Sequence, residues 1–210
     1  MNGPDFSFEA AAIARGARHV AGVDEVGRGP LCGPVTAAAV ILVPDMIPPG
    51  LNDSKKLSPK RRKELFVWLT EHCDWSVAHV GVEEIDRLNI YHASHLAMCR
   101  AVAGLKQRPD HVLVDGNKLP RDLGLPAEAI VKGDARSVTI AAASILAKVL
   151  RDRIMEDLAQ HYPGYGWEVN AGYPTPAHKK ALLDLGVTPH HRRSFKPVHN
   201  ILCKSPLPSN

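Results

Sequence analysis

A long hydrophobic run is missing from this sequence of 210 residues. The longest apolar stretch, residues 35–43, is far shorter than the roughly 20 residues that a membrane-spanning helix requires. Asp5 and Glu9 lie where a secretory signal would carry its apolar segment. We therefore expect a protein with no membrane association and a cytoplasmic location.

Paired cysteines are missing as well. The four cysteines are scattered along the chain, and none belongs to a C-x-x-C pair. This spacing argues against a structural zinc site and against a disulfide framework. It favours a reducing compartment.

The net charge of +4 is small, so it does not by itself indicate a polyanionic partner. The distribution of charge is more informative. Residues 55–63 contain six Lys or Arg and no acid, and residues 178–204 contain six Lys or Arg and one acid, Asp184. Each cluster suits either a solvated face or a contact with phosphate groups, and the sequence leaves both interpretations open.

Short apolar segments alternate with helix-like ones, which is typical of an α/β fold. The predicted strands are residues 19–26, 34–43, 75–81, 111–116 and 129–134. The predicted helices are residues 59–72, 82–105, 137–160 and 176–185. A tight turn joins the first two strands, so we expect a mixed sheet that is antiparallel at its beginning and parallel later.

One compact domain accounts for most of the chain. We place an N-terminal extension at residues 1–16, the main domain at residues 17–186 and a basic C-terminal segment at residues 187–210. Because this last segment has few apolar residues, we expect it to run over the surface as a short helical or extended piece.

Carboxylates stand at the ends of three predicted strands: Asp24 with Glu25, then Asp115, then Asp134. Ligands gather at such strand ends in α/β sheets. Two unit charges about 4 Å apart repel by roughly 4 kcal/mol at an effective dielectric constant of 20, so four converging acids need protons or cations. Oxygen ligands suit Mg²⁺ or Mn²⁺, and two such ions are the usual means of cleaving a phosphodiester.

Simpler interpretations remain open for these residues. Asp followed by Gly, as at Asp115, is ordinary turn chemistry. Neighbouring strand residues point to opposite faces, so Asp24 and Glu25 share a site only if the strand bends near Gly27. The glycines beside Arg28 let the backbone approach a ligand, and Arg28 could contact a phosphate or a base. The same turn also suits a tight hairpin with a solvated arginine.

Several motifs follow one another in a specific order along residues 19–198. They are Asp24-Glu25-Val26-Gly27-Arg28-Gly29-Pro30-Leu31, Asp53-Ser54-Lys55-Lys56-Leu57-Ser58, Val114-Asp115-Gly116-Asn117, Lys132-Gly133-Asp134, the run from Ile140 to Val149, Arg151-Asp152, Gly172-Tyr173-Pro174-Thr175 and Arg192-Arg193-Ser194-Phe195. Each motif alone is modest evidence. The ordered set resembles ribonuclease HII, the type 2 ribonuclease H.

This resemblance implies a ribonuclease-H-like fold, in which helices flank a mixed five-stranded sheet. It implies an endonuclease that cuts the RNA strand of RNA–DNA hybrids and nicks duplex DNA at embedded ribonucleotides. The products would carry 5′-phosphate and 3′-hydroxyl ends. Two divalent ions, Mg²⁺ or Mn²⁺, would take part in the reaction.

The resemblance also assigns roles to individual residues. The metal-binding acids would be Asp24, Glu25, Asp115 and Asp134. The turn that reads the 2′-hydroxyl group at the cut would be Gly27, Arg28 and Gly29. Tyr173 would stack beside the sugar at the junction, and Lys55 would lie near the nucleic-acid backbone.

Two other functions remain open at this point: a branched-DNA resolvase of the same fold, and a non-catalytic module that binds nucleic acid through the basic clusters. The expected partners are RNA–DNA hybrids and DNA duplexes that contain ribonucleotides. We expect a monomer. Residues 199–210 could contact a replication clamp, although they contain no clear clamp-binding motif.

Overall fold

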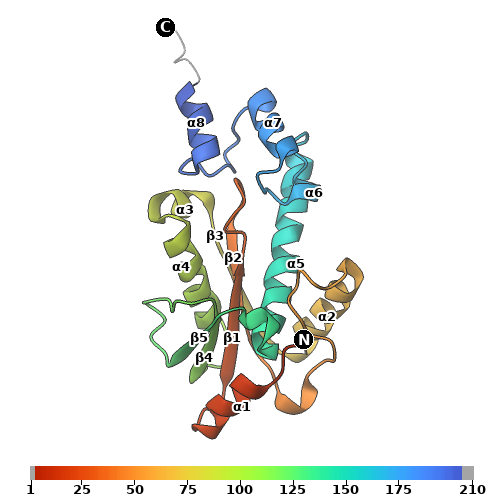
Figure 1. Cartoon of the computed structure of the whole chain (residues 1–210), viewed down its shortest axis with the longest axis vertical. Coiled ribbons are helices and arrows are strands. Elements are labelled where there is room, and N and C mark those ends of the chain that lie inside the picture. Colours follow the sequence, from red (N-terminus) through yellow and green to blue (C-terminus); the bar gives the residue numbers. More distant parts are fainter. Residues whose placement is uncertain (1–2, 205–210) are drawn as a thin grey trace.

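The computed structural model describes residues 3–204, which form a sheet covered by helices on both faces (Figure 1). The strands are β1 (Val20–Val26), β2 (Val35–Ile41), β3 (Asp74–Val80), β4 (His111–Asp115) and β5 (Ala127–Ile130). The helices are α1 (Ser7–Ala14), α2 (Pro59–His72), α3 (Val82–Leu88), α4 (Ile90–Ala103), α5 (Val138–His161), α6 (Trp167–Asn170), α7 (Pro176–Leu185) and α8 (Lys196–Lys204). The predicted α/β class is confirmed.

The sheet has five strands in the order β3-β2-β1-β4-β5. β1 pairs antiparallel with β2, and β2 pairs antiparallel with β3. β4 lies parallel to both β1 and β5. The expectation of a mixed sheet, antiparallel first and parallel later, is therefore confirmed.

Each face of the sheet has its own apolar core. α4 covers one face, where Val23 and Val114 pack with Ala97 and Met98. α5 and α2 cover the other face, on the opposite side of the sheet in Figure 1. α5 lies so close to β1 that a Cβ on Gly22 would come within 2.4 Å of its backbone. Small side chains at the start of α5 make this approach feasible.

Two predicted elements differ in detail from the structure. The helical region 82–105 is two helices, because Asn89 takes φ +66° and its side chain caps α4. The strand expected at 129–134 begins earlier and ends at Ile130. Lys132, at φ +56°, then turns the chain into a short 3-10 helix, Gly133–Ala135, before α5.

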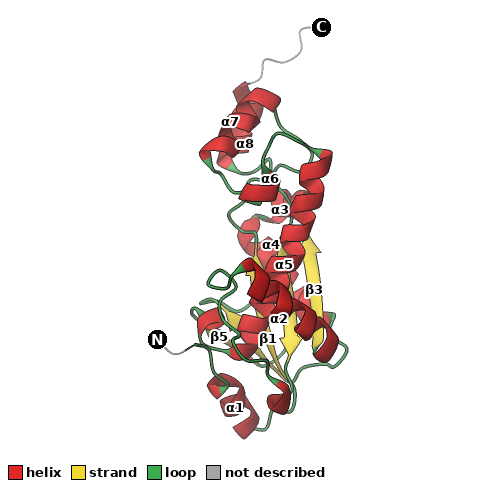
Figure 2. Ribbon diagram, turned by 90° about the vertical axis from the view of Figure 1, so that its right-hand side faces the viewer, coloured by secondary structure: helices red, strands yellow, loops and turns green. Residues whose placement is uncertain are grey.

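The C-terminal segment contains a short helix, as expected, but it runs over the surface only in part. Figure 2 shows α6, α7 and α8 gathered beyond one end of the sheet. His191, Arg192 and Val198 are fully buried there, so polar side chains anchor a segment that has few apolar ones. The clamp contact predicted for residues 199–210 falls partly outside the described residues. Among residues 3–204, no helix combines the length and the apolar character needed to span a bilayer.

Candidate active site

Three of the predicted carboxylates meet at one edge of the sheet. One oxygen from each of Asp24, Glu25 and Asp115 lies within 4.8 Å of the other two. β1 pairs with β4 only as far as Val23 opposite Val114, and it then continues beside β2 alone. Asp24 and Glu25 therefore border the open end of β4, where Asp115 is the last strand residue.

Asp134 reaches this region from the 3-10 helix rather than from a strand end. It lines a cavity of about 150 Å³ together with Asp24 and Glu25. The cluster of three oxygens does not include Asp134. The structure therefore brings Asp134 to the same cavity but not into the tightest group of acids.

The rest of the cavity wall carries the residues that the resemblance associates with substrate. They are Gly27, Arg28, Gly29, Lys55 and Tyr173, accompanied by Val26, Ser54 and Ser144. Every predicted site residue except Asp115 thus lines one cavity, and Asp115 borders it through its cluster with two of the lining acids.

Crowding perturbs the protonation of these acids. Burial raises the pKa of Asp24 well above its ordinary value, and the charges of Glu25, Asp115 and Asp134 raise it further. Burial, followed by the charges of Asp53 and Asp115, raises the pKa of Asp134 to about 6. Burial also raises the pKa of Asp115, although backbone N–H groups oppose this rise. The ionised forms therefore need a cation beside them.

Of the two carboxylate oxygens of Glu25, one accepts a hydrogen bond and the other has no partner among the described residues. Its Oε1 accepts a hydrogen bond from Arg28 Nη1 at 3.3 Å. Burial raises the pKa of Glu25, and the charge of Arg28 opposes that rise. Its Oε2 is buried and has no hydrogen-bond partner among the described residues. An unpartnered carboxylate oxygen beside two other acids is a donor that a hard divalent cation prefers, so these residues fit Mg²⁺ or Mn²⁺.

The turn after β1 needs its glycines for geometric reasons. Gly27 has φ +93°, and a Cβ there would come within 2.2 Å of Arg151 Nε. A Cβ on Gly29 would lie 3.3 Å from the ring of Tyr173. The turn and Tyr173 are thus close neighbours, and the ring is 38% exposed, which leaves it open to a ligand.

Two buried arginines support this turn, and sequence reasoning missed the role of both. Arg192 donates hydrogen bonds to the carbonyl oxygens of Gly27 at 2.6 Å, of Arg28 at 3.1 Å and of Gly33 at 2.9 and 3.0 Å. Burial, and then repulsion from Arg151, lowers the pKa of Arg192 to about 9. Arginine is rarely buried, so only its place in a family motif could have drawn attention to Arg192.

Arg151, on α5, is the second of these supports. Its guanidinium donates to the carbonyl oxygens of Pro34 at 3.0 Å, Ala171 at 3.0 Å and Cys32 at 3.3 Å. It therefore ties the turn after β1 to the loop that carries Tyr173. Carbonyl groups, rather than carboxylates, receive the N–H groups of both arginines.

Lys55 lies on a loop beside the carboxylates. Its N–H donates to Asp53 Oδ1 at 2.9 Å, and the N–H of Ser54 donates to Ser144 Oγ of α5 at 3.1 Å. The positive charge of Lys55 lowers the pKa of Asp134, against the larger effect of burial. Ser144 and Asp53 were not predicted as site residues. Their contacts depend on a loop and a helix that are far apart in the sequence.

A second cluster, formed by Cys32, His178 and His191, is fully buried and also has ligand atoms within 4.8 Å of one another. Hydrogen bonds already occupy its ring nitrogens. His178 Nδ1 donates to the Tyr173 carbonyl at 2.9 Å, and its Nε2 accepts from Trp167 at 3.0 Å and faces His191 Nε2 at 3.3 Å. His191 Nδ1 accepts a backbone N–H at 3.0 Å. This cluster is therefore a hydrogen-bonded part of the core.

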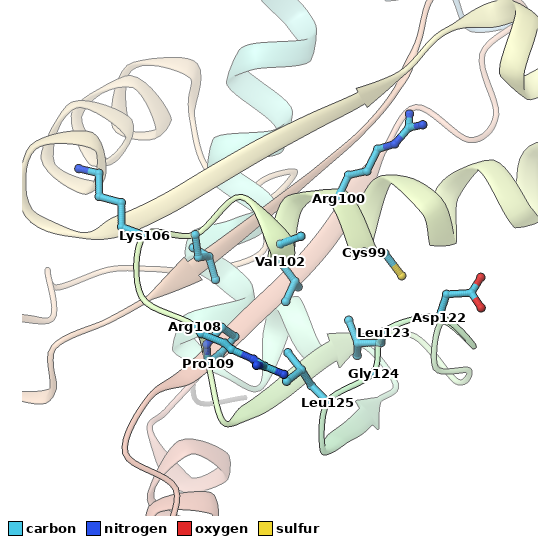
Figure 3. Close-up of a pocket in the computed structure, with 12 residues that line it drawn as sticks. Cys99, Arg100, Val102, Lys106, Arg108, Pro109, Asp122, Leu123, Gly124 and Leu125 are labelled. Atoms are coloured by element: carbon cyan, nitrogen blue, oxygen red, sulfur yellow. The ribbon is translucent and has the colours of Figure 1, made fainter.

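A larger cavity, of about 540 Å³, lies elsewhere, between the end of α4 and the loop before β5 (Figure 3). Its lining includes the apolar side chains of Val102, Leu123 and Leu125 and the charged side chains of Arg108 and Asp122, all labelled in Figure 3. None of the predicted site residues lines it. Size alone therefore does not identify the functional site in this molecule.

Comparisons with known proteins agree with this geometry. The family model described as Ribonuclease HII matches residues 21–198. A ribonuclease HII from Paracoccus denitrificans is 74% identical over 204 residues, which cover 97% of each chain. The chain belongs to the ribonuclease HII family.

Solved structures of this family have the same fold. The ribonuclease H2 of Pyrococcus horikoshii aligns with a TM-score of 0.75 and 31% identity, over 88% of this chain and 97% of that chain. The RNase HII of Archaeoglobus fulgidus, solved in a complex with PCNA, aligns with a TM-score of 0.73 and 28% identity, over 85% of this chain and 96% of that chain. The predicted ribonuclease-H-like fold is confirmed.

Membership of the ribonuclease HII family establishes the function as that of a ribonuclease H, a hydrolytic endonuclease that acts on nucleic acid. The interpretation as a non-catalytic binding module, left open by the sequence, is therefore set aside. So is the branched-DNA resolvase. The roles of individual residues within the site remain predictions, as do the domain boundaries at residues 16 and 186.

Proposed function

We propose that this enzyme cuts the RNA strand of RNA–DNA hybrids, and nicks duplex DNA at single ribonucleotides, with two divalent ions held by Asp24, Glu25, Asp115 and Asp134. The observation that carries the proposal is the convergence of one buried and three half-buried acids, all with raised pKa values, at one small cavity. We propose Mg²⁺ or Mn²⁺, because both accept an all-oxygen set of ligands.

Bound ions would activate the attacking water and neutralise charge on the leaving oxygen. The residues of the chain prepare that arrangement. Gly133 N–H donates to Asp115 Oδ1 at 2.7 Å, which leaves the other oxygen of Asp115 to act as a ligand. Glu25 N–H donates to Asp24 Oδ1 at 2.7 Å and orients that carboxylate in the same way. Hydrolysis in this site would leave a 5′-phosphate and a 3′-hydroxyl end.

The turn at Gly27, Arg28 and Gly29 would recognise the ribonucleotide. Arg192 engages the carbonyl oxygens of Gly27 and Arg28, so these carbonyl groups face the interior. Backbone N–H groups of the turn are then free to face a ligand. The 2′-hydroxyl group distinguishes RNA from DNA, and a backbone turn can read it at close range. Tyr173, next to Gly29, would stack against the neighbouring sugar.

Lys55 and the two basic clusters would contact the phosphates on either side of the cut. Contacts of this kind position a duplex without reading its sequence, and they make binding depend on salt concentration. We propose that the enzyme works as a monomer, which light scattering would test. A clamp contact like that of the Archaeoglobus relative would be tested by mixing the full chain with the clamp of its own organism.

The experiment uses a DNA duplex that contains one ribonucleotide, incubated with the enzyme and with either Mg²⁺, Mn²⁺ or EDTA. We expect a single nick in the presence of either metal and none with EDTA, with 5′-phosphate and 3′-hydroxyl ends. An all-DNA duplex of the same sequence is the control and should stay intact. Cleavage in EDTA, or equal cleavage of the all-DNA duplex, would contradict the proposal.

A further inference from the structure

Glu9 is a buried acid that belongs to none of the sequence motifs quoted above. It lies on α1, before the first residue that the family model matches, and it is only 1% exposed. Its Oε1 accepts hydrogen bonds from Ser137 Oγ and from the N–H of Thr139, the latter at 3.0 Å. A side chain of the N-terminal extension therefore binds the first turn of α5. The N–H groups of that turn have no acceptor within the helix, so they favour a negative charge beside them.

From Ser137 the contacts continue to the carboxylates. Ser137 N–H donates to the carbonyl of Gly133 at 2.8 Å, and Gly133 N–H donates to Asp115 Oδ1 at 2.7 Å. A Cβ on Gly133 would lie 3.2 Å from that same oxygen, so the segment and Asp115 are closely packed. Asp134 is the next residue along this segment. Glu9 thus stands at the start of a continuous chain of hydrogen bonds that ends at the metal-binding acids.

The backbone near Glu9 holds the same segment. Asp5 N–H donates to the Arg136 carbonyl at 3.1 Å, and Val138 N–H donates to the Asp5 carbonyl at 3.2 Å. The Arg136 guanidinium lies 4.8 Å from the centre of the Phe8 ring. These contacts fix the chain on both sides of Ser137. They also place the N-terminal extension against the segment that carries Asp134.

We propose that Glu9 is a positioning residue for the metal site: it fixes residues 133–137, and through them the carboxylates of Asp115 and Asp134. This inference rests on the proposed role of those two acids as metal ligands. Glu9 itself is buried against the first turn of α5 and does not line the carboxylate cavity. Its effect is on the geometry in which the two acids meet a cation.

A purely structural role for Glu9 makes a different prediction. If Glu9 only stabilised α5, its loss would lower the melting temperature and leave metal binding by the folded protein unchanged. If Glu9 positions the acids, its loss weakens metal binding even at temperatures where the protein is fully folded. The two roles are separated by measuring metal affinity and stability on the same variants.

Four variants of the full chain provide the comparison. Glu9→Ala removes the carboxylate acceptor. Glu9→Asp keeps a carboxylate but shortens the side chain by one methylene group, which moves the acceptor away from Ser137 and Thr139. Glu9→Gln keeps an oxygen acceptor for Ser137 and Thr139. Val102→Ala is the matched control, because it removes buried methyl groups on the opposite face of the sheet.

Mn²⁺ binding is measured by titration calorimetry without substrate, at a temperature where circular dichroism shows each variant to be folded. We expect Glu9→Ala and Glu9→Asp to bind Mn²⁺ about tenfold more weakly than the unmodified chain, in the range seen when residues that orient metal ligands are lost. Glu9→Gln should stay close to the unmodified chain. Val102→Ala should lose stability but keep its affinity.

The result that overturns the inference is normal Mn²⁺ affinity in both Glu9→Asp and any folded Glu9→Ala. An equal loss of affinity in Val102→Ala would overturn it as well, because general loosening would then be the cause. Asp115→Asn is titrated in parallel to test the underlying site. If Asp115→Asn binds Mn²⁺ normally, the proposed metal site is wrong, and that outcome is distinct from a failure at Glu9 alone.

Discussion

The carboxylate cavity and the turn beside it differ in how their charged side chains are compensated. In the cavity, like charges crowd together, their pKa values rise, and Glu25 Oε2 has no partner among the described residues. Arg151 and Arg192, which support the turn, are fully buried, but backbone carbonyls satisfy them. The first region is incomplete without a cation, whereas the second is complete within the protein. Crowded carboxylates therefore indicate a cation site here, whereas arginines satisfied by carbonyl groups indicate a structural support.

The strongest test of this contrast is Asp24→Asn. Loss of a metal ligand should reduce cleavage of the ribonucleotide-containing duplex by about 1,000-fold or more, since metal-ion stabilisation amounts to several kcal/mol. The melting temperature without metal should stay equal or rise, because the substitution removes a buried charge among like charges. Cleavage assays and thermal melts in EDTA measure both. Full activity, or a large loss of stability, would contradict the description of this region as incomplete.

Arg192→Lys probes the opposite region. A lysine keeps the charge but cannot reach three carbonyl groups at once, so we expect a loss of stability of about 2–4 kcal/mol. Activity on the ribonucleotide substrate should also fall, because the turn is no longer held. Urea unfolding and cleavage rates measure the two effects. Arg193→Lys is the neighbouring control and should change stability little, since Arg193 is exposed.

The pH dependence of stability sharpens the comparison further. The pKa of Asp134 in the folded protein is about 6, above the ordinary 3.8, so the folded state binds this proton more tightly than the unfolded chain does. Its contribution to stability is therefore present below about pH 4 and is lost as the pH rises to about 6. Asp134→Asn should reduce this decline but not abolish it, because the pKa values of Asp24, Glu25 and Asp115 are raised as well. Urea unfolding in EDTA at several pH values tests it, and an unchanged decline would exclude Asp134 as one of its sources.

Lys55→Ala should have the smallest effect, because Lys55 is exposed and would contact only a phosphate. Binding to the duplex should weaken about equally for all sequences, and the salt dependence of binding should fall by about one unit of slope. Fluorescence anisotropy at several salt concentrations, with Ca²⁺ in place of the catalytic metal, gives this slope. An unchanged slope would remove Lys55 from the phosphate contacts.

The sequence was sufficient to draw attention to the acids and to predict a mixed sheet, antiparallel at its beginning and parallel later. Carboxylates in apolar strands violate ordinary strand composition, so Asp24, Glu25 and Asp115 were conspicuous. The separate question of how adjacent Asp24 and Glu25 could share a site was harder. The structure brings their oxygens together although both residues pair regularly with β2, and it does so where β1 extends past the end of β4. Register of this kind depends on pairing between distant segments, which local patterns do not report.

The buried residues that hold the site in place could not be predicted from the sequence. Arg192 and Glu9 have side chains that are usually exposed, and their burial depends on contacts with residues more than 100 positions away. The scarcity of apolar residues in 187–210 predicted a surface segment, yet His191, Arg192 and Val198 of this segment are fully buried. Asp134 lines the cavity, and its role as a metal ligand stays a prediction; the left-handed Lys132 places it on a 3-10 helix instead of a strand.

The position of Arg192 near the end of the chain has a consequence for biosynthesis. A ribosome delivers all four acids and the turn after β1 well before it delivers the guanidinium that engages the carbonyl groups of Gly27 and Gly33. Domains form while translation proceeds, so the sheet can assemble around an unsupported turn. The nascent chain would thus acquire the acids that we propose to bind cations first, and the support for the turn that we propose to read the ribose last.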